Sequence, residues 1–361
     1  MIAVLGECVA DGFTDRRPTH GPDEAHGPHR VDGTHRADRV GGAEPPGAEP
    51  SVTRRKQADR LGRAGLAGPV KLAGPVGGTG LWVMAGGGPA NTAVALARLG
   101  TETRFLGRIS GDVFGSMFRE RLAASGVNLS GCVEASEPST LAVAALDEDG
   151  RAAYIFYAEG AADWQWTPYE LDRDRLGSAA CLHTGSLALV RPPGRAAVEE
   201  FAAKAAAHAT VSIDPNVRPS LATRDDYQVA RWCEWADILK LSDDDLGFLL
   251  PGVPLDRACD IWHAAGARLV VVTRGAAGAL VSLDGARATV QAPRVQVVDT
   301  VGAGDAFTAG LLHHLGANGL LGGRLDALDL GAAMEAAAFA ARVAALTCSV
   351  AGADPPWSDS L

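Results

Sequence analysis

Short apolar runs alternate with stretches of helical periodicity along most of this chain of 361 residues. Residues 210–214, 237–242 and 268–273 are short aliphatic runs that predict buried strands. Ahead of the first and third of these runs, residues 195–208 and 256–265 have the spacing of helices. Strand–helix alternation at this spacing predicts an α/β fold with a central, mainly parallel sheet and helices on both faces.

Two other segments predict strands outside that alternation. The continuous apolar run MIAVLGECV, residues 1–9, predicts one buried strand. Residues 139–157 hold two β-like runs on either side of the turn sequence DEDG, and this pattern predicts a hairpin.

The hydrophobic pattern is lost between residues 14 and 65, which contain no Phe, Tyr or Trp and are rich in Gly, Pro, Arg, Asp and His. Such a stretch buries too little apolar surface to offset its ordering entropy, so we predict a disordered insert at about 14–75. It holds four histidines at irregular spacings: His20, His26, His29 and His35. A solvated insert is favoured over a metal-binding or interaction arm.

The charge and the cysteines limit the possible partners and location. The formal net charge is −10 and no large Lys/Arg cluster exists, so we expect neither nucleic acid nor an anionic membrane as a main partner. No run of 18 uncharged apolar residues is present, and Glu7 and Asp11 argue against a signal peptide. Six cysteines without a CxxC pair favour reduced thiols and a cytoplasmic protein.

The stretch DTVGAGDAFTAGL, residues 299–311, combines a loop of small residues with the start of a helix. Phe307, Leu311 and Leu315 fall on one helical face. The free N–H groups at a helix start attract anions, and small residues allow a close approach. Asp305 at this place either caps the helix or removes a proton from a hydroxyl group that attacks phosphorus.

Other nucleotide and hydrolase motifs are absent from the sequence. It has no Gly-Lys dipeptide and therefore no Walker P-loop, and no GxGxxG follows the first apolar run. It also lacks the GxSxG nucleophile elbow and the HExxH zinc motif.

Six segments resemble the ribokinase-like (PfkB-type) carbohydrate kinase family, in the family's order. They are GECVAD (6–11), GGGPANTAVALARLG (86–100), DPNVRP (214–219), LKLSDDDL (239–246), VTRGAAG (272–278) and DTVGAGDAFTAGLL (299–312). The resemblance covers the chain except roughly residues 14 to 75. It implies one kinase domain over 1–361, with a small β lid formed by strands near 76–86 and 139–158.

The resemblance implies an ATP-dependent kinase that phosphorylates a sugar hydroxyl, uses Mg²⁺ and forms a homodimer through its lid. Asp305 would be the catalytic base, and the backbone of Gly302, Ala303 and Gly304 the anion hole. The residues that would bind sugar hydroxyls are Asp11, Gly87 and Asn91. The residues that would face ATP are Asn216, Lys240, Thr273, Gly275, Gly278 and Gly304, with Asp214 near the phosphates and magnesium. Asp299 and the Val301 carbonyl would bind a monovalent cation such as K⁺, opposite CSVAGA (348–353).

Several positions depart from the family pattern. Asp11 and Gly86 are separated by 74 residues, so the insert falls where lid strands normally form. Ser242 and Asp245 stand where many members have Asn and Glu, which weakens their assignment to magnesium. Ala158 stands where kinases of acidic sugars tend to carry arginine, and an unpaired buried carboxylate would be costly.

The sequence therefore resembles the bacterial fructokinase branch of the family more than the kinases of acidic sugars. A ribokinase, another neutral-sugar kinase or a nucleoside kinase remains the alternative, as does a non-catalytic sugar-binding regulator on the same fold. Trp164 and Trp166 either flank the sugar or pack between lid and core.

Overall fold

The computed structural model describes residues 1–14, 70–72, 81–146 and 152–361, which belong to one compact unit. Of the predicted insert at about 14–75, it describes Thr14 and residues 70–72, which are strand residues. The rest of the insert, its four histidines and the DEDG turn lie outside the described residues.

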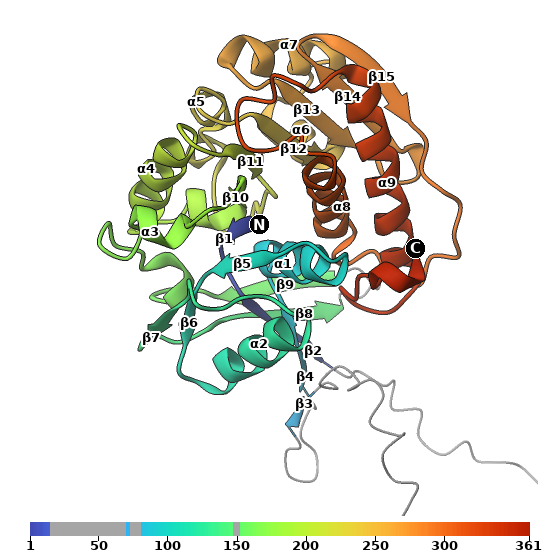
Figure 1. The fold of residues 1–361 in the computed structure, drawn as a ribbon. Coiled ribbons are helices and arrows are strands. Elements are labelled where there is room, and N and C mark those ends of the chain that lie inside the picture. Colours follow the sequence, from blue (N-terminus) through green and yellow to red (C-terminus); the bar gives the residue numbers. More distant parts are fainter. Residues whose placement is uncertain (15–69, 73–80, 147–151) are drawn as a thin grey trace, which may run out of the picture. The chain divides into compact units, whose positions relative to one another are not determined.

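An eight-stranded sheet runs through the described chain (Figure 1), in the order β15-β14-β13-β12-β11-β10-β1-β5. Its strands are β1 (Ile2–Leu5), β5 (Thr103–Leu106), β10 (Cys181–Gly185), β11 (Thr210–Asp214), β12 (Ile238–Ser242), β13 (Leu269–Thr273), β14 (Ala279–Leu283) and β15 (Ala286–Val290). The neighbours from β13 to β5 are all parallel, and β14 and β15 continue the sheet in antiparallel pairing. The three strands predicted from 210–214, 237–242 and 268–273 are present and differ by at most one residue at their starts.

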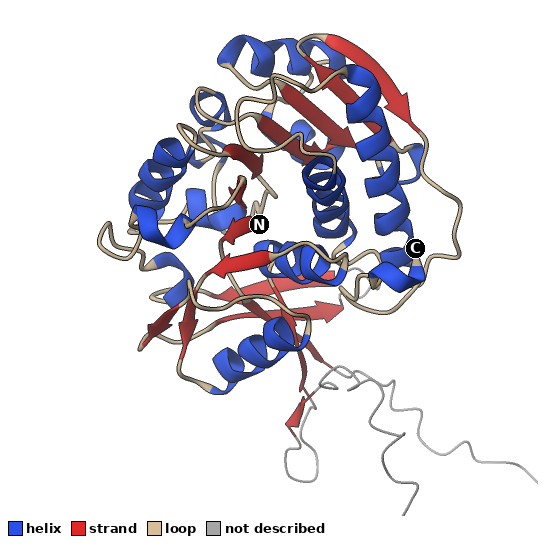
Figure 2. Cartoon of the chain, viewed as in Figure 1, coloured by secondary structure: helices blue, strands red, loops and turns tan. Residues whose placement is uncertain are grey.

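Helices cover both faces of this sheet (Figure 2). The α-helices of the described chain are α1 (Gly88–Arg98), α2 (Val113–Ala124), α3 (Arg173–Leu176), α4 (Arg195–Ala205), α5 (Val229–Cys233), α6 (Asp243–Leu249), α7 (Leu255–Ala265), α8 (Ala303–Ala317) and α9 (Leu330–Cys348), and α2 packs on β4 and β6 instead of on this sheet. The alternation along β1 shows how two cores arise, because Ile2 and Val4 pack with α1, α8 and α9, whereas Ala3 and Leu5 pack with α4, α5 and α7. The predicted α/β class is therefore confirmed.

A second, five-stranded sheet has the order β3-β4-β2-β8-β9, and we call it the lid sheet. Its strands are β2 (Val9–Thr14), β3 (Val70–Leu72), β4 (Leu81–Gly86), β8 (Thr140–Leu146) and β9 (Ala152–Tyr157). Strands β2 and β4 are antiparallel, with Val9 opposite Gly86 and Thr14 opposite Leu81. A small parallel pair, β6 (Arg108–Ser110) and β7 (Val133–Ala135), completes the described strands.

The prediction of one strand over residues 1–9 is wrong, because β1 ends at Leu5 and β2 begins at Val9 in the other sheet. The connection passes close to the start of α1, where a Cβ on Gly6 would lie 2.2 Å from the Pro89 ring. Both halves of the run are buried and apolar. Hydrophobicity alone therefore does not reveal that they belong to different sheets.

Helix α9 is the one helix of the described chain that is long and apolar enough to cross a membrane, judged by length and composition only. Core helices of soluble proteins share these properties. Its alanines at 333, 336, 337 and 340 are buried. Close packing on α8 explains this burial, since a Cβ on Gly310 would lie 2.8 Å from the Ala340 Cα. This face of α9 is therefore part of the core.

Candidate active site

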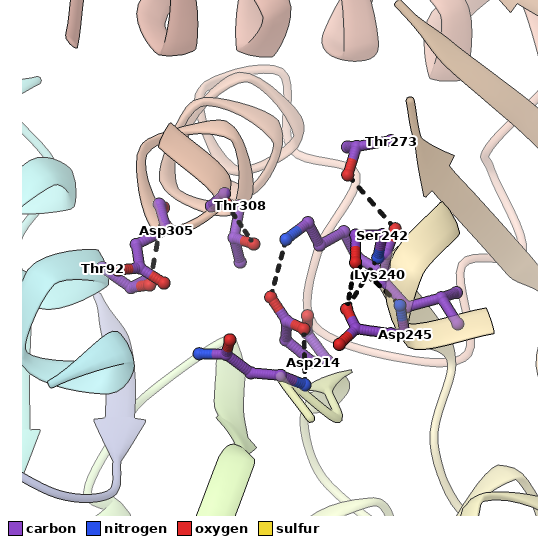
Figure 3. Close-up of polar contacts among 12 residues, drawn as sticks. Thr92, Asp214, Lys240, Ser242, Asp245, Thr273, Asp305 and Thr308 are labelled. Carbon is purple, nitrogen blue, oxygen red and sulfur yellow. Dashed lines mark hydrogen bonds and ion pairs between the residues drawn. The ribbon is translucent and has the colours of Figure 1, made fainter. Parts of the chain in front are cut away.

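The predicted site residues gather where the parallel strands end. Asp214 is the last residue of β11, Thr273 is the last residue of β13, and Lys240 lies within β12 between them. The carboxyl ends of parallel strands are the usual ligand-binding edge of an open α/β sheet. The starts of α1 and α8 meet at the same edge, because the Thr92 hydroxyl donates a hydrogen bond to the Asp305 carbonyl at 3.4 Å (Figure 3).

The loop before α8 is shaped by Gly302. This residue precedes the helix in the left-handed conformation, with φ of 76°, and a Cβ there would lie 2.5 Å from the Ala353 Cβ. Only glycine satisfies both conditions without strain. The loop therefore delivers the first N–H groups of α8, which have no partners within the helix, to the edge of the sheet. They form an electropositive place at which an anion can bind.

Asp305 lies in the first turn of α8 and does not cap the helix with its side chain. Its Oδ2 instead accepts a hydrogen bond of 2.9 Å from Asn91 Nδ2 on α1. Burial raises the pKa of Asp305, while the hydrogen bond from Asn91 and the charge of Lys240 oppose the rise. This arrangement fits a base better than a helix cap.

The residues predicted to bind the sugar lie on the lid side of Asp305. Asp11 belongs to β2, and a Cβ on Gly86 would lie 1.9 Å from Asp11 Oδ2. Gly87 has φ of 100° and turns the chain into α1, on which Asn91 is buried. Burial raises the pKa of Asp11 to about 6, and nearby Arg218 and Arg121 oppose this rise.

The residues predicted to lie near the phosphates are on the other side of Asp305. Lys240 Nζ lies 2.7 Å from Asp214 Oδ2, and both side chains are buried (Figure 3). The Asn216 N–H donates to Asp214 Oδ1 at 3.1 Å. A Cβ on Gly304 would lie 3.1 Å from Lys240 Nζ, so the ammonium group is beside the start of α8.

A cavity lies beside Asp305, and its lining includes Asp305, Asp214, Asn216, Thr92, Ser186 and His183. A Cβ on Gly88, which also lines it, would lie 2.4 Å from Asn216 Nδ2 and 3.2 Å from Asp305 Oδ1. The structure therefore brings Asn216 and Asp305 together at one cavity. Asn91 is hydrogen-bonded to Asp305, and Lys240 lies beside the start of α8.

The other predicted ATP residues lie on the turn between β13 and β14. Thr273 donates to the Leu241 carbonyl at 3.3 Å. Gly275 and Gly278 have φ of 51° and 84°, and a Cβ on Gly278 would lie 1.9 Å from the Val290 carbonyl oxygen. The second glycine is therefore required by the turn itself. Thr273 lies beside Ser242 in the sheet, at the same edge as Lys240.

Asp299 and Val301, predicted for a monovalent cation, lie in the loop before α8. Asp299 Oδ1 accepts the Val301 N–H at 3.0 Å, and its Oδ2 accepts the Gly352 N–H at 2.8 Å. The carboxylate thus joins this loop to the segment after α9. Within the described ranges, no group of three or more His, Cys, Asp or Glu side chains could hold a metal ion.

Two further pairs of residues have structural roles. Ser242 and Asp245 form a capping box at the start of α6, and Asp245 Oδ1 also accepts the Val217 N–H at 2.8 Å. Trp164 and Trp166 are both buried, and Trp164 Nε1 donates to the Ala158 carbonyl at 3.0 Å. Of the two roles considered for the tryptophans, packing is favoured.

Sequence reasoning did not single out several residues near the cavity. One of them is Ser186, which has φ of 49° and lines it together with the predicted Asn216, whose φ is 41°. Non-glycine residues in this conformation cluster at functional sites. The charge of Arg218 lowers the pKa of Asp305, Asp11 and Glu7. Arg218 and Glu7 stood within quoted motifs, whereas Ser186 and His183 lay outside them.

Glu7 gives a test of buried charge at this edge. It is 2% exposed, and its Oε2 has no partner in the part of the chain that the structure describes. Burial raises its pKa from 4.5 to about 7, against a hydrogen bond from Ser186. The pKa of Glu7 is higher in the folded protein than in the unfolded chain, so the protonated carboxyl stabilises the folded state. This contribution to the free energy of unfolding is fully present below about pH 4.5 and is lost as the pH rises through about 7.

We therefore expect Glu7→Gln to gain stability relative to the wild type as the pH rises, by roughly 3 kcal/mol between pH 4.5 and 8.5. Urea unfolding at pH 4.5, 6, 7 and 8.5 would measure the difference. Glu134→Gln, at an exposed position, controls for loss of a carboxylate. A difference that stays constant with pH for Glu7→Gln would contradict this account.

Comparison with known proteins places this site in a family. Residues 74–360 match the pfkB family carbohydrate kinases. A fructokinase from Rhizobium leguminosarum bv. trifolii is 39% identical over 249 residues, covering 68% of this chain and 76% of that protein. Probable fructokinase-5 of Arabidopsis thaliana is 36% identical over 286 residues, covering 77% and 86%.

The same grouping is found among solved structures. The crystal structure of fructokinase with bound ATP from Xylella fastidiosa superposes with a TM-score of 0.75 at 25% identity, covering 98% of this chain and 93% of that one. The fold, the site at the ends of the parallel strands and the sequence match agree. The chain therefore belongs to the pfkB family of carbohydrate kinases.

Proposed function

We propose that this carbohydrate kinase transfers the γ-phosphoryl group of ATP to a hydroxyl group of fructose, with Asp305 as the base. The observation that carries this proposal is the position of Asp305. Its carboxylate lies at the open start of α8, with Asn91 hydrogen-bonded to it and Lys240 close enough to lower its pKa. The names of the relatives in plants and bacteria support fructose as the sugar.

The lid side of the site fits a neutral, polyhydroxylated ligand. Asn91 Oδ1 is buried without a hydrogen-bond partner among the described groups, so it is available to a sugar hydroxyl. Asp11 offers carboxylate oxygens for the same purpose, and Gly87 lets the backbone approach. Ala158 is buried among Ala161, Trp164 and Leu187, so its own position supplies no cation to an acidic sugar.

The chemistry follows from the charges around Asp305. The raised pKa makes its carboxylate a better proton acceptor than an exposed aspartate, so it takes the proton of the attacking hydroxyl. ATP supplies the phosphoryl group. The backbone N–H groups of Gly302, Ala303 and Gly304, with the ammonium of Lys240, would stabilise the negative charge of that group.

The remaining assignments belong to the same proposal. Asn216 and Asp214 would lie beside the phosphates and Mg²⁺. Thr273, Gly275 and Gly278 would hold the nucleotide. Asp299 and the Val301 carbonyl would bind K⁺.

We also propose a cytoplasmic enzyme whose partners are its sugar and ATP, with neither nucleic acid nor membrane. A homodimer through the lid sheet is part of this proposal. Strand β9 exposes Ile155 and Tyr157, which are 56% and 62% accessible. Exposed apolar side chains on a sheet are suited to contact with a second copy.

ADP production by the purified protein with ATP and Mg²⁺ tests the proposal. Fructose, ribose, 2-keto-3-deoxygluconate and adenosine are compared, each with and without K⁺. We expect kcat/KM for fructose to exceed that for the others by at least about tenfold. A preference for ribose or adenosine would overturn the sugar assignment. Sugar binding without turnover on any of them would indicate a regulator instead of an enzyme.

A further inference from the structure

Arg121 on α2 extends to two segments that lie behind opposite sides of the active site. One of its amino groups donates a hydrogen bond to the Ala85 carbonyl and the other to the Ala353 carbonyl. These acceptors are 36 and 232 residues away along the chain. One guanidinium therefore connects strand β4 of the lid sheet with the segment that follows α9.

Each of these carbonyls belongs to a segment that supports one half of the site. Ala85 comes immediately before Gly86, which packs directly against the Asp11 carboxylate. Ala353 packs on Gly302, the residue that precedes α8, and the neighbouring Gly352 donates to Asp299. Arg121 thus binds a residue next to the sugar side of the site and a residue that packs on the anion-binding loop.

A second arginine, Arg98, lies close to this guanidinium and acts on its pKa. Burial and the charge of Arg98 lower the pKa of Arg121, while Asp354 and Asp11 oppose the change. Arg98 pairs with Asp354, donates to the Pro355 carbonyl at 2.8 Å and lies 5.0 Å from the ring centre of Trp357. These contacts anchor the segment after α9.

The shape of the guanidinium matters because it is a planar, rigid fork. Two acceptors bound to the same fork have a fixed relative position, which a flexible ammonium cannot impose. A shift of β4 when a sugar binds would therefore be transmitted to Ala353 and the loop before Asp305.

We propose that Arg121 is a positioning residue that couples sugar binding on the lid side to phosphate binding at the start of α8. The proposal rests on the proposed function, because it takes the two ligands to be a sugar and ATP. Coupling of this kind is reciprocal, so each ligand increases the affinity for the other by the same factor.

The same helix provides a matched control. Arg119 also donates to two backbone carbonyls, those of Ser110 and Ile109, each at 2.8 Å. Both acceptors belong to β6. The hydrogen bonds of Arg119 therefore connect α2 with neither the Gly86 segment nor the Gly302 loop. Replacing Arg119 removes an equivalent pair of hydrogen bonds without touching the proposed link.

The experiment measures the sugar dissociation constant by calorimetry with and without AMP-PNP and Mg²⁺, using the sugar that the wild-type enzyme turns over fastest. We expect AMP-PNP to tighten sugar binding at least about fivefold in the wild type and in Arg119→Met. In Arg121→Met the ratio of the sugar dissociation constants without and with AMP-PNP should fall to about one. If Arg121 served packing alone, sugar binding would weaken equally with and without AMP-PNP, and this ratio would stay unchanged.

Arg121→Lys decides the outcome if Arg121→Met does not fold, because one ammonium is not expected to hold both carbonyls in a fixed relation. A wild-type ratio in Arg121→Lys, or a ratio lost equally in Arg119→Met, would overturn the proposal. So would a wild-type ratio of one. A failure of the fructose assignment is seen separately, in the ADP assay.

Discussion

Asp305→Ala is expected to reduce kcat by about 10²–10⁴-fold while the protein still binds its sugar. The carboxylate is the base in our proposal, and it lies where the sugar side and the anion-binding start of α8 meet. Sugar affinity should fall only modestly, since Asp11 and Asn91 remain. Initial rates of ADP production and calorimetric sugar binding measure the two quantities.

Asp305→Asn is the matched variant because it keeps the shape of the side chain and an oxygen that can accept from Asn91. Its kcat should fall as far as that of Asp305→Ala, but it should bind the sugar more tightly than Asp305→Ala does. Either variant retaining more than about a tenth of the wild-type kcat would show that Asp305 is not the base.

Lys240→Met is expected to cost roughly 3–5 kcal/mol of unfolding free energy, because it leaves the Asp214 carboxylate buried without its partner. The two side chains are 4% and 8% exposed and lie 2.7 Å apart. Urea unfolding measures the loss. The double variant Lys240→Met/Asp214→Asn should recover a large part of it, since no unpaired buried charge remains.

An exposed ion pair provides the control for this prediction. Lys204 and Glu200 lie 2.6 Å apart on α4 with side chains 74% and 58% exposed. Lys204→Met should change stability by no more than about 0.5 kcal/mol. Similar losses for Lys204→Met and Lys240→Met would mean that burial does not set the strength of the Lys240–Asp214 pair.

Much of the fold could be predicted because local patterns and tertiary structure agree. Phe307, Leu311 and Leu315 are spaced along one helical face, and all three are buried in α8. The strands ending at Asp214 and Thr273 were visible as aliphatic runs. The position of Asp305 at a helix start followed from the small residues before it.

The parts that could not be predicted depend on contacts between distant segments. Hydrophobicity does not distinguish β1 from β2, and the close approach of Gly6 to Pro89 between them is a contact between distant segments. Arg121 reads as a surface residue of a helix, and its acceptors are backbone carbonyls that carry no sequence signal. Ser186 is notable only through its backbone conformation.

The pairing of β2 with β4 has a consequence for how this chain can change in length. Val9 and Gly86 are paired at the end that carries the site residues, whereas Thr14 and Leu81 are paired at the other end. The chain leaves β2 at Thr14, passes through β3 (Val70–Leu72) and enters β4 at Leu81. Loop-closure entropy grows only slowly with loop length, so added residues at this end cost little. Long insertions, or a fused domain, can thus be tolerated there while Asp11 and Gly86 keep their register.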